Sequence, residues 1–495
     1  MKTLPPWRAA DLPAPPPFSF RNMIAVIGPG TIALSMSIGG GEWLLGPTTI
    51  VKYGFSMMWI VTVSVLVQLM MNLQFVRYTL YTGEPIVNGF MRTAPGPWFW
   101  AVVYLVLAAC QAGWPAWAAN SASTLFGAWH HRLPGTQPGV DDSRMMLYLG
   151  IGTYVLCVLI VAFGGKVERM LEIVNWFMVI FIVGFLLVVD ILFVPADVWW
   201  KGLAGHFHLG WLPKGGQGVD WILLGAFAAY AGAGGISNLW MTNWVRDKGM
   251  GMGSVVGYIP SAVGGKVVKV SPTGSAFPPN AENMTRWRQW WKYAHIDQVC
   301  VWAVGCFLGM YLNVILAAAL IPPGTDIGTG LAPGANQAKY LSEAAAAKFG
   351  TPVAGDVLWF VTLLNGFWIL FGTQLAFIDG FVRLATDVLW TASEKIRNAT
   401  KGDIRKVYYT LLVLYAGWGC FAMSLKQPLT LLKISANVAG VVFVFAGLHV
   451  LRSNKILLPK EVQSPFWQRA IVGFGVLFYG FFSVMNLIVL LRGKP

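Results

Sequence analysis

AVIGPGTIALSMSIGGGEWLLGPTTIV, residues 25–51, is an apolar stretch that three successive glycines and an acid interrupt at its centre. Gly39, Gly40 and Gly41 precede Glu42, and each glycine weakens a helix by roughly 1 kcal/mol relative to alanine. Non-helical backbone at membrane depth is tolerated only inside protein or beside a water-filled cavity. The stretch therefore predicts a broken membrane helix whose break faces the protein interior.

A second interrupted stretch, LLGAFAAYAGAGGISNLWMTNW, occupies residues 223–244. It carries three glycines and then two polar residues: Gly232, Gly234, Gly235, Ser237 and Asn238. Two broken helices at matching places in two halves of a chain indicate an inverted-repeat transporter. The alternative is that the glycines only allow helices to pack closely. We expect the two helices to be unwound at 39–42 and 234–238 and to face each other across a cavity.

The composition excludes a soluble enzyme. Of the 495 residues, 56% are hydrophobic and 11% are charged, whereas soluble proteins carry about 25% charged residues. Apolar runs of about 20 residues match the length that crosses ~30 Å of hydrocarbon. We predict an all-α polytopic membrane protein with one transmembrane domain, 23–491. It has eleven helices in a 5+5 inverted repeat, with the first and sixth broken, at 23–53, 55–82, 96–127, 145–165, 168–195, 218–246, 298–321, 356–390, 408–424, 428–450 and 466–491.

The basic residues predict the orientation of the chain. With the amino terminus inside, 24 Lys and Arg fall on the cytosolic side and 10 on the outer side. Residues 1–22 are then a proline-rich cytosolic tail and 492–495 an outer tail, and we expect a bacterial inner membrane. The inner loop 247–297 contains RWRQWWKYAH (286–295), which is typical of an interfacial lipid anchor. The net charge of +14 reflects orientation, so no nucleic-acid partner is expected.

Four motifs at matching spacings carry a family resemblance. Gly28-Pro29-Gly30 stands eight residues before the 39–42 break, and the other motifs are Gly235-Ile236-Ser237-Asn238, Gly372-Thr373-Gln374 with Ile378-Asp379-Gly380-Phe381, and Leu431-Leu432-Lys433-Ile434-Ser435-Ala436-Asn437. With them the chain resembles the NRAMP family of divalent-metal transporters, within the amino-acid, polyamine and organocation superfamily. The resemblance implies a secondary transporter that moves a cation by alternating access, with no enzymatic activity and no cofactor.

The departures from the family pattern concern the metal site. The metal-binding aspartate, asparagine and methionine of the family fall on Gly39, Glu42 and Gly235 here. Because a thioether selects soft ions while carboxylates and water suit hard ones, we expect a hydrated divalent ion such as Mg²⁺ or Mn²⁺. Ser237 replaces the family's histidine, and residues 101–127 contain no acid. Proton coupling by the family's route is therefore not expected.

Glu42 and Lys433 are the charged candidate site residues, and both lie within predicted spans. Glu42 can bind a cationic substrate, carry a proton or form a salt bridge, since a buried carboxylate requires a partner. Lys433 can pair with Glu42, replace a coupling ion, bind a substrate carboxylate or extend to the membrane surface. If Lys433 meets a carboxylate, the cargo is instead a small organic solute, either a carboxylate or an amino-acid-like molecule.

Neutral residues complete the predicted substrate site. Its backbone comes from Gly39, Gly41 and Gly235, and its oxygens come from the polar side chains Ser237, Asn238, Ser435 and Asn437. The alternative role for these side chains is hydrogen bonding between helices. Asp379 and Arg383 stand four residues apart and are expected to form an ion pair on one helix. A protein of the same fold that senses without transporting is a further possibility, although no signalling domain is evident.

Overall fold

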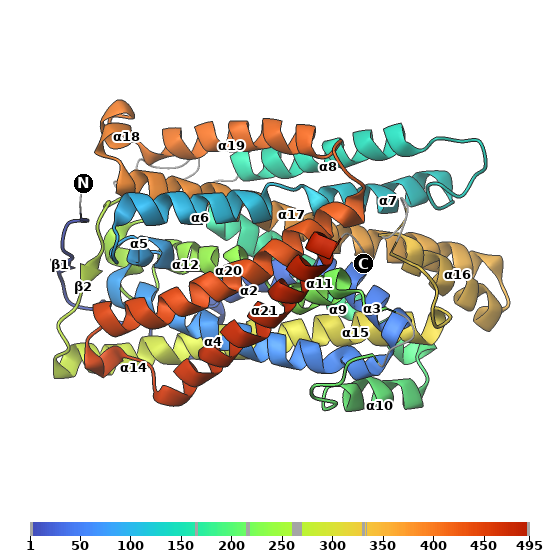
Figure 1. Cartoon of the computed structure of the whole chain (residues 1–495), viewed down its shortest axis with the longest axis horizontal. Helices are drawn as coiled ribbons and strands as arrows, with labels where there is room; N and C mark the ends of the chain where they lie inside the picture. Colours follow the sequence, from blue (N-terminus) through green and yellow to red (C-terminus); the bar gives the residue numbers. More distant parts are fainter. Residues whose placement is uncertain are drawn as a thin grey trace.

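The structure is a computed structural model that describes residues 3–163, 167–213, 218–259, 270–328, 332 and 334–492. The predicted helix end at 165, residues 260–269 of the predicted inner loop and most of the predicted 492–495 tail lie outside this part of the chain. The described chain forms an elongated bundle of helices that run roughly along its long axis (Figure 1).

The helices follow one another along the chain with short connections. Their bounds are α1 Phe20–Val26, α2 Pro29–Ser37, α3 Gly46–Tyr53, α4 Met58–Thr82, α5 Ile86–Phe90, α6 Pro97–Ala112, α7 Ala116–His130, α8 Ser143–Phe163, α9 Val167–Phe193, α10 Ala196–Gly205, α11 Trp221–Tyr230, α12 Ile236–Asp247, α13 Gly253–Val256, α14 Ala281–His295, α15 Val304–Leu320, α16 Asn336–Phe349, α17 Pro352–Ala392, α18 Glu394–Ala399, α19 Ile404–Ala422, α20 Pro428–Leu457 and α21 Phe466–Arg492. Two π-helical segments, Gly41–Leu45 and Ile296–Ala303, and two 3₁₀ turns, Phe55–Met57 and Lys460–Val462, complete the helical structure. The strands β1 Arg8–Ala9 and β2 Ser275–Ala276 pair in parallel.

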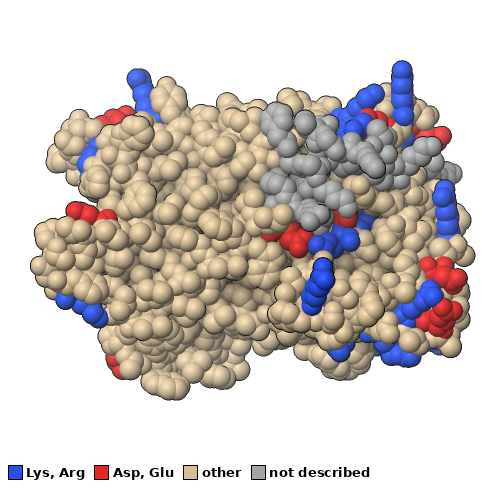
Figure 2. Space-filling view, turned by 180° about the vertical axis from the view of Figure 1, so that it is seen from behind, with Lys and Arg blue, Asp and Glu red and all other residues tan. Residues whose placement is uncertain are grey.

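Eight helices of the described chain are long and apolar enough to cross a membrane, and a bent pair at the amino terminus raises this number to nine. Charged side chains gather toward the two ends of the molecule and leave a broad uncharged belt between them (Figure 2). A multi-pass membrane protein is thus confirmed. All eleven predicted ranges contain helix, although α19 and the short helices α11 and α12 are not among the eight.

One predicted helix is bent, and another starts too late. The predicted range 23–53 contains α1 and the segment Pro29–Tyr53, which are bent by 62° from each other and together are long and apolar enough to form one span. Proline at the first helical position of α2 and Gly28 before it fix the place of the bend. The predicted helix 298–321 begins much earlier, because α14, a π-helical segment and α15 form one continuous helix of 40 residues, Ala281–Leu320.

The proline-rich tail packs against α14, at the end of the molecule that carries the amino terminus (Figure 1). The Trp290 indole donates to the Pro13 carbonyl at 2.8 Å, and the Tyr293 hydroxyl donates to Pro16 at 3.2 Å. The Asn283 side chain accepts from the Leu12 amide at 3.0 Å. The aromatic residues of the predicted lipid anchor therefore serve in part as a docking surface for the chain's own tail.

Candidate functional site

The first helix is broken where the sequence predicts a break. α2 ends at Ser37, Ile38 leaves the helical region with ψ of 79°, and a π-helical segment starts at Gly41. The interruption thus covers residues 38–39, because Gly40 is already helical with φ of −63° and ψ of −25°, and it begins one residue earlier than the predicted 39–42. It is shorter than predicted because Gly41 and Glu42 already belong to the π-helical segment, in which the backbone is hydrogen bonded again.

The sixth helix is broken between Tyr230 and Ile236. Three glycines adopt positive φ angles, 118° at Gly232, 87° at Gly234 and 61° at Gly235, and such angles are accessible chiefly to glycine. The predicted interruption at 234–238 is therefore placed too late. Its last polar residues, Ser237 and Asn238, lie in the first turn of α12. Ser237 turns back on the break and donates to the Ala233 carbonyl at 2.6 Å.

Glu42 joins the two breaks. Its Oε2 accepts a hydrogen bond from the Gly39 amide at 3.1 Å, and its Oε1 accepts one from the Gly232 amide at 3.3 Å. The side chain has no solvent exposure. Gly41 lies directly against the Tyr230 carbonyl, so that a Cβ at this position would overlap the carbonyl oxygen. The two broken helices therefore face each other at a buried carboxylate, as the sequence predicts.

Two glutamines from neighbouring helices satisfy the backbone groups that the break in the sixth helix leaves open. Gln111 on α6 donates to the Gly234 carbonyl at 2.8 Å and accepts from the Ile236 amide at 2.9 Å. Gln68 on α4 donates to the Ala231 carbonyl at 3.0 Å and accepts from the Gly234 amide at 3.3 Å. Each amide side chain thus replaces helical hydrogen bonds, which is what allows irregular backbone inside a membrane.

Between the breaks lies a small cavity of about 10 Å³. Aromatic rings form much of its wall, with the Trp117 ring 3.8 Å from that of Phe377 and 5.8 Å from that of Tyr230. The Tyr230 hydroxyl and Ser435 Oγ are 2.5 Å apart, which connects α20 to this wall. A volume of this size holds about one water molecule. The two breaks are therefore packed closely together.

Lys433 and Asn437 are predicted site residues that lie elsewhere. Both stand on the face of α20 that borders a groove between α11, α20 and α21, whereas Ser435 points to the opposite side. Residues four apart share a helix face and residues two apart do not, which explains the separation. Within the described chain no ion pair joins Lys433 to Glu42. The described residues also contain no group of three or more His, Cys, Asp or Glu that could hold a metal.

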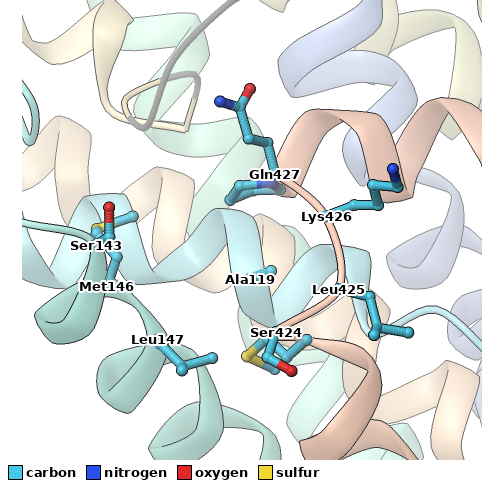
Figure 3. A pocket seen from close by; sticks show the side chains of 10 residues that line it. Ala119, Ser143, Met146, Leu147, Ser424, Leu425, Lys426 and Gln427 are labelled. Atoms are coloured by element: carbon cyan, nitrogen blue, oxygen red, sulfur yellow. The ribbon is translucent and has the colours of Figure 1, made fainter.

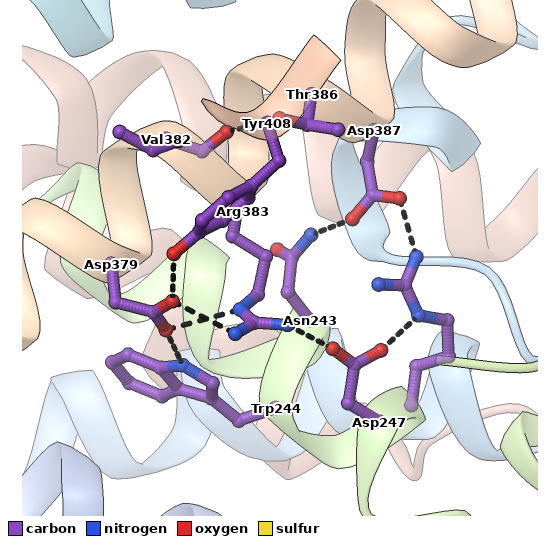
Figure 4. A network of polar contacts seen from close by, with 10 residues as sticks. Asn243, Trp244, Asp247, Asp379, Val382, Arg383, Thr386, Asp387 and Tyr408 are labelled. Carbon is purple, nitrogen blue, oxygen red and sulfur yellow. Dashed lines mark hydrogen bonds and ion pairs between the residues drawn. The ribbon is translucent and has the colours of Figure 1, made fainter. Parts of the chain in front are cut away.

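The predicted Asp379–Arg383 pair is present and belongs to a larger buried network (Figure 4). The Arg383 guanidinium binds both Asp379 oxygens, at 2.8 and 3.0 Å, and pairs with Asp247 of α12. Asp379 also accepts from the Tyr408 hydroxyl at 2.6 Å and from the Trp244 indole at 2.8 Å. The network thus ties α12, α17 and α19 together.

Asp247 extends this network to a second guanidinium. Arg246 binds Asp247 at 2.6 Å and Asp387 at 2.5 Å. Asn243 donates to the other oxygen of Asp387 at 2.5 Å. Asp379 and Arg383 are the part of the network that could be read from the sequence, because they lie four residues apart on one helix.

Several residues that form the site are not among the site residues that the sequence predicts. The sequence could have indicated Gln68 and Gln111, because an amide side chain in an apolar span needs a polar partner. Tyr230 also stands directly before the glycine cluster. Nothing in the sequence distinguishes Trp117, Phe377 and Met36 as site residues, because aromatic residues and methionines are common throughout the spans.

A larger cavity of about 470 Å³ lies apart from the breaks (Figure 3). It is bordered by α7, the start of α8 and the connection from α19 to α20, with Ser143, Ser424, Lys426 and Gln427 on its rim. None of the residues at either helix break contributes to its wall. It is therefore not part of the candidate site.

No protein-family model and no curated protein matches the chain. Solved structures do match it. A mutant of the Eremococcus coleocola manganese transporter superposes with a TM-score of 0.62 at 10% identity, over 97% of this chain and 89% of that chain. The same transporter in complex with an aromatic bis-isothiourea substituted compound gives a TM-score of 0.60 at 12% identity, over 96% and 88%. The fold expected from the resemblance to the NRAMP family is therefore confirmed, and the chain is folded as this manganese transporter is.

Proposed function

We propose that the protein is a secondary transporter that moves a divalent cation across the membrane by alternating access, with Glu42 as the charged ligand of the cargo. The observation that carries this proposal is the position of Glu42, a fully buried acid between two broken helices. The likeness of the fold to a manganese transporter supports it. No cation of the described chain pairs with Glu42, so a cationic cargo can supply the counter-charge that its ionised carboxylate requires.

The donor groups favour a hard ion such as Mg²⁺ or Mn²⁺. The breaks offer one carboxylate and backbone carbonyls, and oxygen ligands suit these ions. A hydrated ion does not fit a cavity of about 10 Å³, so the helices must separate to admit it. The alternative cargo, a small carboxylate, is less well supported because Lys433 lies outside the site.

The cavity wall also contains a sulfur-bearing residue, Met36, whose Sδ accepts from the Trp240 indole at 3.3 Å. A thioether is a ligand for softer transition ions. Replacing Met36 with leucine keeps the volume and removes the sulfur. If the cargo is Mn²⁺ and binds the sulfur, Met36→Leu lowers Mn²⁺ uptake relative to Mg²⁺ uptake. An unchanged ratio indicates that oxygen ligands alone bind the cargo.

Uptake of Mn²⁺ and Mg²⁺ into proteoliposomes tests the proposed role of Glu42. Glu42→Gln keeps the volume and removes a charge-assisted interaction of about 1.5–3 kcal/mol, so the apparent affinity should fall roughly tenfold to a hundredfold. Asp190→Asn is the matched control, because Asp190 is another fully buried acid but lies on α9, and neither of its carboxylate oxygens bonds to a helix break. Equal affinity in the Glu42→Gln variant and the wild type would refute the proposal.

The proposed topology has eleven spans in a 5+5 inverted repeat, with the amino terminus in the cytosol. It is supported by the helix in each predicted range and by the breaks in the first and sixth. A reporter enzyme that is active only outside the cytosol should then be active when fused to the carboxyl terminus.

Because Ser237 stands in place of the family's histidine, uptake should also proceed without a proton gradient. Strict dependence of uptake on that gradient would contradict this part of the proposal.

A further inference from the structure

Lys433 lines a groove of about 780 Å³ that does not belong to the transport site. The groove lies between the start of α11, the first half of α20 and the last part of α21. Its volume is within the range of pockets that enclose a whole small ligand. Most of its wall is apolar, formed by residues such as Ile434, Val438, Val441 and Leu487. The groove therefore fits a long apolar group.

The polar groups of the groove are concentrated on α20 and α21. Asn437 donates to the Ile222 carbonyl at 3.1 Å and accepts from Asn486. Asn486 is only 6% exposed, and its Oδ1 has no hydrogen-bond partner. Ser483 Oγ, also buried, has none either. Because these two atoms are shielded, the polar side chains that a ligand can reach in the groove include those of Lys433 and Thr430, which line it.

Among the described residues, the groove wall carries one cation, Lys433. Lys433 lies in the second turn of α20, where Thr430 precedes it by almost one turn on the same face. No acid of the described chain pairs with Lys433, and Asp220, the acid on the groove wall, is 3.6 Å from Lys52 instead. A cation near the end of a membrane helix, above an apolar groove, complements an anionic head group joined to a hydrocarbon chain.

We propose that this groove binds an anionic phospholipid. The phosphate contacts Lys433 and Thr430, and an acyl chain lies along the apolar wall toward Val441. The groove also borders α11, since Gly225 packs against the paired side chains of Asn437 and Asn486. The bound lipid thus supports the half of the sixth helix that leads to the break.

Lipid binding to the purified, detergent-solubilised protein tests the proposal. Native mass spectrometry should show that phosphatidylglycerol binds about five- to tenfold more tightly than phosphatidylcholine, since each basic side chain near an anionic lipid contributes about 1 kcal/mol or somewhat more. Lys433→Met should abolish this preference and Lys433→Arg should retain it. Lys426→Met is the control, because Lys426 borders the other cavity and not the groove. This readout does not depend on transport.

A second variant tests the apolar part of the site. Val438→Trp fills the groove and should reduce binding of phosphatidylglycerol while the protein keeps its thermal stability in detergent. Three results would overturn the proposal. They are equal binding of the two lipids by the wild type, an unchanged preference in Lys433→Met, and equally tight binding of soluble glycerol 3-phosphate, which would identify an anion site without a lipid chain.

Discussion

At the scale of single residues, the site depends on the absence of side chains. Gly41 touches the Tyr230 carbonyl, which is backbone and cannot move aside as a flexible side chain would. Gly152 on α8, by contrast, has open space where its Cβ would lie. Both glycines are in helical segments, so only their surroundings distinguish them.

The pair gives a direct prediction. Gly41→Ala should destabilise the protein by about 1–3 kcal/mol or more, because the added methyl group forces two helices apart. Gly152→Ala should leave stability unchanged or raise it by up to about 1 kcal/mol, since alanine is the better helix former. Thermal unfolding of both variants in detergent measures the difference. Equal melting temperatures would show that the two breaks do not pack as described.

The sequence identified Glu42 but not its partners. A buried acid beside three glycines is visible in the sequence, whereas its bond to the Gly232 amide connects residues 190 positions apart. The sequence offers Lys433 as a partner, because its predicted depth in the membrane is close to that of Glu42. Depth does not specify the helix face, and the α20 register directs Ser435 to the site and Lys433 away from it.

At the scale of elements, the broken sixth helix is stabilised by its neighbours. Gln111 supplies both a donor and an acceptor to backbone groups that have no helical partner. The glycine cluster predicted that a break exists, and the positive φ angles of Gly232, Gly234 and Gly235 determine where it lies. Such angles cannot be assigned from the sequence, because a glycine also adopts ordinary helical angles.

Removing the Gln111 amide should therefore destabilise the protein. Gln111→Met leaves the buried Ile236 amide unsatisfied, at a cost of about 1–3 kcal/mol, and removes one of the donors to the Gly234 carbonyl, which keeps its bond from Ser237. Asn365→Leu on α17 is the control, because neither amide atom of Asn365 has a hydrogen-bond partner. Its replacement should be neutral or stabilising. Unfolding in detergent distinguishes the two, and a larger loss in Asn365→Leu would contradict the proposed role of Gln111.

At the scale of the whole molecule, a buried network of charges connects helices that are distant in the sequence. Arg383→Met leaves Asp379 without its cation and Asp247 with Arg246 alone, and should destabilise the protein by about 3–5 kcal/mol. Tyr408→Phe removes one hydrogen bond and should have a smaller effect. Combining Arg383→Met with Asp379→Asn should restore part of the stability. A double variant less stable than Arg383→Met would show that Asp379 does not need this partner.

The amino-terminal tail connects the molecule in another way. Trp290→Phe removes the donor to Pro13 and should increase cleavage of the tail by a protease, because a free tail is accessible. Trp291→Phe is the control, since the Trp291 ring stacks on Trp287 and contacts Arg77 without bonding the tail. Equal cleavage of the two variants would indicate that the tail is held by other contacts.

The docking of the tail also has a consequence for the order of events during biosynthesis. Residues 12–17 leave the ribosome well before α14, because their partners on α14 are synthesised more than 260 residues later. At roughly 5–20 residues per second, the ribosome needs on the order of 15–60 seconds to reach them. During that interval the prolines are available to chaperones or proteases, and protection of the tail marks the moment at which the seventh helix has joined the bundle.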